Sequence, residues 1–175
     1  RGAGGRMRGE CEAGSGTSGE VLRPAAAGAA PSEDQAEHHP VAAGCRVLLV
    51  DGDVTVRMPL ETALSRAGFH VVAAVGGSEA LALYESALSR GARYDAVVMD
   101  LTMPGGISGD AAMARIRELD PEACGIVASG YHDAPVLADH RRFGFRGLIT
   151  KPFTAEQLAQ VILRALHGQP EEDAA

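Results

Sequence analysis

The sequence lacks the features of two classes of protein. No apolar run approaches the roughly 20 residues that a membrane-spanning helix needs, and the longest ones, 47–50 and 96–99, have the length of strands. The 16 Lys and Arg residues are outnumbered by 23 Asp and Glu residues, which gives a formal net charge of −7, and they form no dense basic stripe. Direct nucleic-acid binding is therefore disfavoured, because it depends on clustered positive charge.

Cysteine is also scarce, and its spacing excludes a clustered metal site. Cys11, Cys45 and Cys124 lie far apart in the sequence, and an odd number of cysteines cannot all pair within one chain. We therefore expect free thiols in a reducing cytoplasm. The chain has no signal-peptide pattern and begins with Arg1 rather than Met, which predicts a segment cut from a longer protein.

The composition predicts one globular domain with extra segments. The sequence is 46% hydrophobic and 22% charged, values that suit a folded core. Residues 25–44 contain Ala, Pro, Gly and charged residues with no hydrophobic period, so they cannot bury enough apolar surface to offset the entropy of ordering. We interpret 25–44 as a flexible linker, 45–168 as the domain and 169–175 as a tail.

Strand and helix patterns alternate from Cys45 onward. Short apolar runs predict five strands, at 46–50, 70–75, 94–100, 125–129 and 146–150. Helical periodicity predicts five helices between and after the strands. The first follows residue 53, with Pro59 causing a late start or a slight kink, and the second has Ser78 as its N-cap. The third is marked by Met113, Ile116 and Leu119, the fourth covers roughly 133–142, and the fifth ends at Gly168.

This alternation predicts an α/β fold. Buried strands that alternate with helices form a parallel sheet covered on both sides. Right-handed crossovers leave few topologies for such a sheet, and the flavodoxin-like (βα)5 three-layer sandwich with a five-stranded parallel sheet is the commonest at this size.

Polar residues follow four of the predicted strands. Asp51, Gly52 and Asp53 follow the first, Asp100 ends the third, Ser129 ends the fourth, and Thr150, Lys151 and Pro152 close the fifth. Ligands of open α/β sheets bind beyond the carboxyl ends of the strands, and clustered carboxylates there favour a hard cation such as Mg²⁺. An anionic group on Asp100 would be flanked by the metal, Ser129 and Lys151, which predicts phosphoryl transfer to Asp100 as the nucleophile.

Each of these residues also has a simpler interpretation when taken alone. An Asp after a strand is more often a helix N-cap or a turn former than a nucleophile. Ser129 before Gly130 fits an ordinary turn, and Lys151 fits a solvated surface charge. The joint occurrence of one such group per strand, in this order, favours the site.

Four segments resemble the motifs of the response regulator receiver family, in the order and at the spacing of that family. They are RVLLVDGD, VVMDLTMPGG, IVASGY and LITKPF, and the resemblance covers about residues 45–167. Carried over residue by residue, it implies an acidic metal pocket at Asp51, the phosphoacceptor at Asp100, a backbone carbonyl ligand for Mg²⁺ at Thr102, a switch hydroxyl at Ser129 and a phosphoryl-contacting lysine at Lys151. The resemblance also implies a cis bond before Pro152.

Two positions depart from the family pattern. Gly52 stands where the family has a second adjacent acid that ligates the metal, which predicts weakened Mg²⁺ binding; Asp53 is a candidate substitute ligand. Leu148 stands where many members have an aromatic switch residue, so a switch based on an aromatic rotamer is unavailable; receivers that are fused to kinases often lack this aromatic residue as well.

Residues 1–24 carry a second resemblance. Gly4, Gly5, Gly14, Gly16, Thr17 and Pro24 fit the frame of the last hairpin of a histidine kinase ATP-binding domain. The chain is then similar to the C-terminal end of a hybrid sensor histidine kinase. The phospho-accepting histidine and most of the ATP site of such a kinase are missing, so we expect no ATP binding by this chain.

Three functional hypotheses follow. The first is a receiver that accepts a phosphoryl group from a histidine kinase or a histidine phosphotransfer domain. The second is a pseudo-receiver that acts as an interaction module independent of phosphorylation, because Gly52 replaces a metal-binding acid. The third, a flavin- or nucleotide-binding α/β protein, is disfavoured because the loop DGDVT is acidic and has no glycine-rich phosphate cradle.

Overall fold

The computed structural model describes residues 44–103, 106–130, 136 and 139–168. The predicted hairpin remnant (1–24), almost all of the predicted linker and the tail lie outside these residues. Within the described part the elements are β1 (Arg46–Val50), α1 (Val54–Arg66), β2 (His70–Ala74), α2 (Gly77–Ser89), β3 (Ala96–Asp100), α3 (Gly109–Leu119), β4 (Gly125–Ser129), β5 (Phe145–Thr150) and α5 (Ala155–His167).

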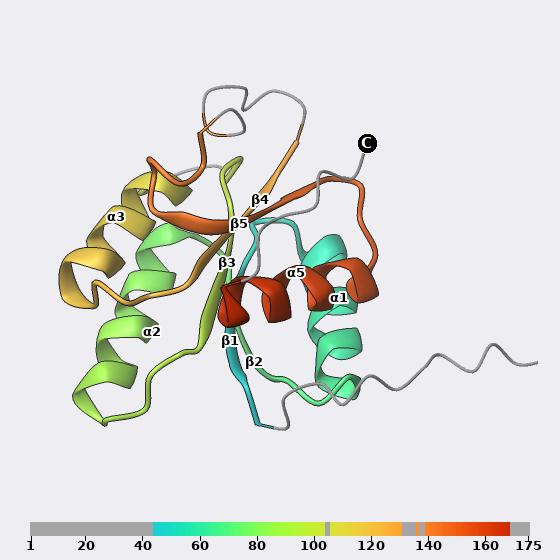
Figure 1. Ribbon diagram of the computed structural model, residues 1–175, viewed down its shortest axis with the longest axis horizontal. Helices are drawn as coiled ribbons and strands as arrows, with labels where there is room; N and C mark the ends of the chain where they lie inside the picture. The colour runs from blue at the N-terminus through green and yellow to red at the C-terminus, as the bar shows by residue number, and fades with distance from the viewer. Residues whose placement is uncertain (1–43, 104–105, 131–135, 137–138, 169–175) are drawn as a thin grey trace, which may run out of the picture. The chain divides into compact units, whose positions relative to one another are not determined.

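The strands form one parallel sheet of five strands in the order β2-β1-β3-β4-β5. This order is the flavodoxin-like topology, so the predicted fold is confirmed. Helices α1 and α5 cover one face of the sheet, and α2 and α3 cover the other (Figure 1). The residues of β3 and β4 are all buried, as expected of strands covered on both faces.

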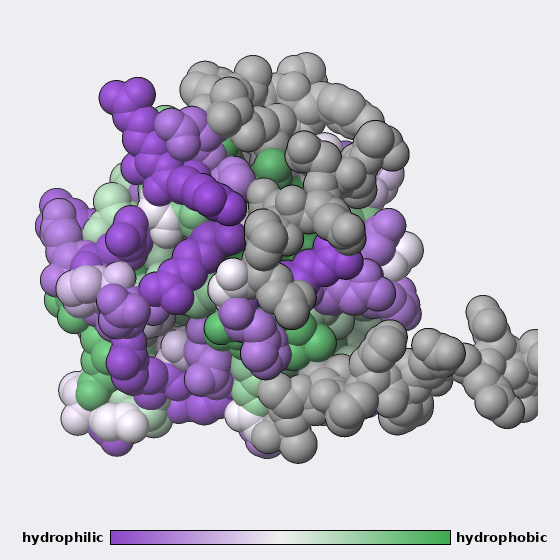
Figure 2. Space-filling view, in the orientation of Figure 1, coloured by the Kyte–Doolittle hydropathy of each residue, from purple (hydrophilic) through white to green (hydrophobic). Residues whose placement is uncertain are grey.

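Successive residues of the central strands point into two separate hydrophobic cores. Leu49 lies in the core with Leu64 of α1 and Ile162 of α5, whereas Leu48 lies in the core with Met113 of α3. Each such buried side chain contributes about 1.5–3 kcal/mol relative to an exposed one. The outer surfaces of α2 and α3 are largely hydrophilic (Figure 2), as amphipathic helices on a sheet require.

Of the two effects expected of Pro59, a late start of the first helix is not observed, and the N-cap predicted for the second helix is wrong. Helix α1 begins directly after its N-cap Asp53 and runs through Pro59, because the cap stabilises a first turn that precedes the proline. Helix α2 has Gly76 as its N-cap, and Ser78 is already its second residue. The Glu79 carboxylate accepts a hydrogen bond from the Val75 N–H at 2.7 Å, which satisfies a backbone donor and lets the helix start earlier.

The later elements agree better with the predictions. Helix α5 has a capping box between Thr154 and Gln157, and it ends at Gly168, which has a left-handed φ of 66°. Leu119, expected on the buried face of α3, is 48% exposed because it is the last residue of the helix. The helix expected over about 133–142 lies mostly outside the described residues; of those that are described, residue 136 is helical and 140–142 belong to a turn.

Candidate functional site

The chemical groups predicted from the sequence meet at one edge of the sheet. All five strands are parallel, so the residues at their carboxyl ends lie side by side. Backbone hydrogen bonds extend this order into the loops: the Asp51 N–H donates to the Ala74 carbonyl at 3.2 Å, and the Lys151 N–H donates to the Ser129 carbonyl at 2.8 Å. Residues far apart in the sequence are therefore held in register.

The ammonium group of Lys151 bridges two buried carboxylates. Its Nζ atom lies 2.8 Å from Oδ2 of Asp51 and 2.8 Å from Oδ2 of Asp100. The Asp51 and Asp100 side chains are 4% and 6% exposed, and that of Lys151 is 25% exposed. Burial alone would lower the pKa of Lys151, but the hydrogen bonds and negative charges of Asp100 and Asp51 outweigh burial and raise it. The lysine therefore stays charged and neutralises the acidic pair.

The second oxygen of Asp100 is held by Thr102. Both the backbone N–H and the hydroxyl of Thr102 donate to Oδ1 of Asp100, at 3.0 and 2.9 Å. This use of the threonine was not predicted from the sequence, which indicated only its carbonyl. The spacing Asp-x-Thr is typical of turns in which an Asp side chain accepts from the residue two positions later, and it was the available signal.

Two hydrogen bonds hold Asp51, one to its side chain and one to its backbone carbonyl. Oδ1 of Asp51 accepts the N–H of Asp53 at 2.8 Å. The Arg57 guanidinium, from the first turns of α1, donates to the Asp51 carbonyl at 2.6 Å. Arg57 was not identified from the sequence, because only the fold shows that its side chain turns back to this loop.

The Asp53 side chain points to the helix rather than to the acidic pair. Its Oδ1 accepts from the N–H and the hydroxyl of Thr55, at 2.8 and 2.7 Å, as the N-cap of α1. The Thr55 hydroxyl and N–H hydrogen bonds lower the pKa of this exposed carboxyl group. The backbone of Asp53 thus supports Asp51, while its carboxylate serves the helix.

Gly109 brings the start of α3 against the backbone of the site. A Cβ atom at this position would overlap the Asp100 carbonyl oxygen and would lie 2.9 Å from Cγ of Met99. Only glycine permits this approach, so Gly109 fixes the distance between α3 and the end of β3. This requirement for glycine was not predicted from the sequence.

Ser129 and Pro152 complete the edge. Ser129 is fully buried, and its hydroxyl donates to the Gly130 carbonyl at 3.0 Å. It directly follows Ala128, the residue that pairs with Asp100 across β3 and β4. The Lys151–Pro152 bond is cis, as the resemblance to receivers implied.

Comparison with known proteins identifies the family. The model of the response regulator receiver domain matches residues 47–163. The chemotaxis protein CheY of Bacillus subtilis is 32% identical over 123 residues, covering 70% of this chain and 98% of CheY. The chain belongs to the response regulator receiver domain family.

Relatives of other architectures and solved structures agree with this assignment. The sensor kinase CckA of Brucella abortus is 35% identical over 126 residues, which cover 70% of this chain but only 13% of CckA. The crystal structure of the receiver domain of NtrX from Brucella abortus has a TM-score of 0.61 and 29% identity, covering 69% of this chain and 98% of that one.

As a receiver domain, this chain offers few ligands to a metal ion. No group of three or more His, Cys, Asp or Glu side chains is placed to hold a metal among the residues described in the structure. Asp51 and Asp100 remain as a pair, and Mg²⁺ is held in many sites by one or two carboxylates together with water and phosphate oxygens. This pair of carboxylates fits such a site, and Lys151 supplies positive charge beside it.

The described cysteines of this receiver lie away from the site. Cys45 and Cys124 are free and buried in the α1–α5 core. Burial, reinforced by Asp95, raises the pKa of Cys45 to about 11, and burial also raises the pKa of Cys124. Both thiols therefore stay protonated and unreactive near neutral pH, as predicted for free, structural cysteines. No helix in the described ranges has the length and apolar character to cross a membrane.

Proposed function

We propose that this receiver accepts a phosphoryl group on Asp100 from the phosphohistidine of a histidine kinase or a histidine phosphotransfer domain. The observation that carries the proposal is the position of Lys151, with its Nζ atom 2.8 Å from both Asp100 and Asp51. An ammonium group held at the acceptor carboxylate compensates negative charge as it develops on an incoming phosphoryl group.

The transfer needs little covalent chemistry from the protein. An oxygen of the Asp100 carboxylate forms a bond to phosphorus while the bond between phosphorus and the donor imidazole breaks. The electron pair of the broken bond stays on the imidazole nitrogen, which is protonated by solvent. Thr102 holds Oδ1 of Asp100 with two hydrogen bonds, so the rotamer of the carboxylate is fixed before the donor arrives.

Asp51, Asp100 and the Thr102 carbonyl are the groups that would hold Mg²⁺. The ion, when bound, would neutralise charge on the transferring phosphoryl oxygens. The buried Ser129 hydroxyl is placed one residue beyond the strand partner of Asp100. We propose that this hydroxyl contacts the phosphoryl group after transfer and so changes the partner-binding surface near β4 and β5.

A small phosphodonor tests this function. The chain is incubated with acetyl phosphate and Mg²⁺, and the intact mass is measured for a base-labile adduct of one phosphoryl group. Wild type and Asp110→Asn, a matched acid in the first turn of α3, are expected to form the adduct. Asp100→Asn is expected to form none, and an adduct that persists in this variant contradicts the assignment of Asp100.

A second candidate function rests on Gly52. The Asp53 side chain caps α1, and no group of three or more possible metal ligands is found among the residues that the structure describes. Without a replacement for the missing acid, the chain would serve as a pseudo-receiver that binds partners without phosphorylation. The same assay separates the two functions. An adduct on Gly52→Asp but none on wild type supports the pseudo-receiver, whereas adducts on both support phosphoryl transfer.

We further propose that the receiver is the C-terminal part of a hybrid histidine kinase in the cytoplasm. The similarity to CckA, a sensor kinase that is much longer than this chain, supports the first part. The free thiols of Cys45 and Cys124 are in keeping with a reducing compartment. Isolating the natural full-length protein and testing it for ATP-dependent autophosphorylation would check this context.

A further inference from the structure

A pocket of about 460 Å³ lies at the end of the sheet opposite to Asp100. It is formed by the last turns of α3 and α5 and by the first residues of β5. Arg146 is the second residue of β5, whereas Lys151 follows the last residue of that strand. The pocket and the acidic site are therefore separated by the length of β5, and they share no residue.

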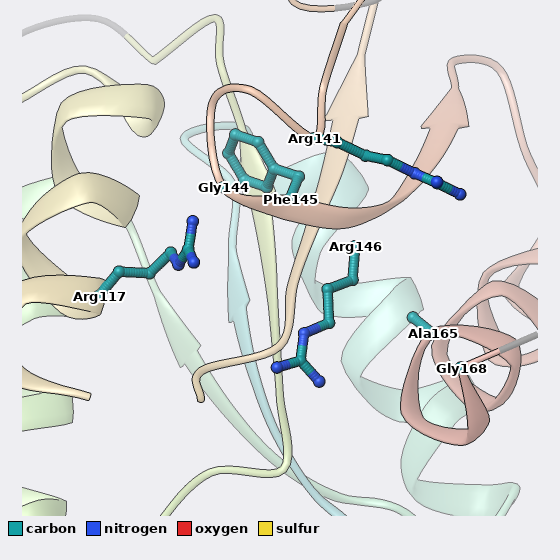
Figure 3. Close-up of a pocket in the computed structure, with 7 residues that line it drawn as sticks. All are labelled: Arg117, Arg141, Gly144, Phe145, Arg146, Ala165 and Gly168. Atoms are coloured by element: carbon teal, nitrogen blue, oxygen red, sulfur yellow. The ribbon is translucent and has the colours of Figure 1, made fainter. Parts of the chain in front are cut away.

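The lining of this pocket is rich in arginine side chains. Arg117, Arg141 and Arg146 line it, and each comes from a different segment of the chain. Figure 3 shows Arg117 reaching from α3 toward β5 and Arg146 extending from β5 into the space between α3 and α5. Arg141 extends away from these two in the same view, so it belongs to the rim of the pocket.

The turn before β5 is built to accommodate Arg117. Gly144 has a φ of +90°, and a Cβ atom at this position would lie 2.6 Å from Nη1 and 2.7 Å from Cδ of Arg117. The guanidinium thus lies against the bare backbone of a glycine. Phe145, the residue after this glycine, is buried and also lines the pocket.

Among the residues that the structure describes, the positive charge of these arginines is only partly compensated. The Nη2 atom of Arg146 lies 3.2 Å from Oε2 of Glu122, but the two side chains are 45% and 77% exposed, and such surface pairs are weak. Guanidinium groups hold phosphate and carboxylate groups with paired hydrogen bonds, more strongly than they hold water. A volume of a few hundred Å³ is that of a small-molecule site.

We propose that this pocket binds a small anion with at least two phosphate or carboxylate groups, one held by Arg117 and one by Arg146. Glu122 would give way to the anion, because its carboxylate is the more exposed partner of the ion pair. Binding would be independent of Asp100 and Lys151, since these lie at the other edge of the sheet.

Calorimetric titration of the full chain with inorganic pyrophosphate, and separately with citrate, tests the proposal and tells phosphate from carboxylate recognition. The variants are Arg117→Ala, Arg117→Lys and Asp100→Asn, with Arg115→Ala as the matched control. Arg115 lies on the same helix and is 67% exposed, but it is not among the residues that line the pocket.

We expect saturable binding of at least one of the two anions by wild type, Arg115→Ala and Asp100→Asn. Arg117→Ala is expected to weaken binding about tenfold or more. Arg117→Lys is expected to weaken it less, because lysine keeps the positive charge but loses the paired hydrogen bonds of the guanidinium. Failure of wild type to bind either anion, or equal losses in Arg117→Ala and Arg115→Ala, would overturn the proposal. Binding that is abolished by Asp100→Asn would also overturn it, since the anion would then occupy the phosphorylation site.

Discussion

The Nζ atom of Lys151 lies 2.8 Å from Oδ2 of Asp100, although 51 positions separate the two residues in the sequence. Lys151 is the only lysine in the chain, and every other residue among its 16 Lys and Arg is an arginine. A compact ammonium group can approach two carboxylates at once, whereas a planar guanidinium presents a wider fork. The geometry of this edge therefore suits a lysine better than the arginine that the chain uses elsewhere.

Replacing Lys151 by Met is predicted to destabilise the fold at neutral pH. The change leaves the buried carboxylates of Asp51 and Asp100 without a counter-charge, and we expect a loss of about 1–3 kcal/mol in the free energy of unfolding. Urea denaturation followed by circular dichroism at pH 8 measures the loss. A Met variant as stable as wild type would show that the bridge contributes nothing net.

The difference in stability between wild type and Lys151→Met is predicted to depend on pH. The pKa of Lys151 is raised in the folded state above its unfolded value of about 10.4. Its contribution is therefore fully present below about pH 10.4 and is lost as the pH rises through the folded pKa. We expect the stability difference between wild type and Lys151→Met to shrink in that range. The difference between Lys151→Arg and Lys151→Met should stay constant there, because the guanidinium keeps its charge.

Restoring an acid at position 52 is predicted to strengthen Mg²⁺ binding. Gly52→Asp adds a third carboxylate beside Asp51 and Asp100, and we expect an increase in affinity of about tenfold or more, measured by calorimetry. Without Mg²⁺ the variant should be less stable than wild type, since like charges repel, and added Mg²⁺ should restore its stability by ligand linkage. Gly52→Asn is the uncharged control, and equal Mg²⁺ affinities for the Asn and Asp variants would contradict the proposed metal pocket.

A methyl group at Gly109 is predicted to destabilise the fold, because it would press on the backbone of Asp100. Gly109→Ala places Cβ against the Asp100 carbonyl oxygen and close to Met99, and such overpacking costs about 1–3 kcal/mol. Alanine is otherwise favoured over glycine in helices by up to about 1 kcal/mol, so a net loss would show that the clash dominates. Thermal unfolding is the measurement. Gly76→Ala is the control, because its Cβ has no neighbour within 4 Å, and it should cost less than about 1 kcal/mol.

The fold and the positions of the strand-end residues could be predicted because both depend on local patterns. Runs such as 46–50 and 125–129 bury on both faces and so contain only apolar residues, apart from their ends. Once the strands are parallel, the residues at their carboxyl ends must meet. Asp51, Asp100 and Lys151 therefore converge as the sequence predicted, and the receiver family follows from the same motifs.

The functions of individual side chains within the loops could not be predicted in the same way. An Asp after a strand can ligate a metal or cap a helix, and Asp53 caps α1 because Thr55 offers both an N–H and a hydroxyl at short range. Arg57 and Gly109 act through backbone carbonyls, and a sequence pattern carries no record of such contacts. The early start of α2 also depended on one side-chain contact, between Glu79 and Val75.

Far from the acceptor site, Tyr84→Phe is predicted to weaken a buried junction between α2, α3 and the loop before β3. The Tyr84 hydroxyl donates to Oδ2 of Asp120 at 2.8 Å, and Asp120 also binds Arg93 through both of its carboxylate oxygens. Removing the hydroxyl should cost about 1–2 kcal/mol at pH 7. Tyr94→Phe is the matched control, because the Tyr94 ring packs 5.7 Å from that of Tyr84 and no hydrogen bond of its hydroxyl is seen within the described ranges.

Lowering the pH should reduce the difference in stability between wild type and Tyr84→Phe. Burial would raise the pKa of Asp120, but the hydrogen bonds from Arg93 and Tyr84 outweigh burial and lower it. A carboxyl group whose folded pKa is depressed below its unfolded value of about 3.9 stabilises the fold above that pH, and this stability is lost as the pH falls through the folded pKa. Urea midpoints of wild type and Tyr84→Phe should therefore approach each other below about pH 4. A difference that stayed constant down to pH 2 would show that the hydroxyl acts through packing and not through the charge of Asp120.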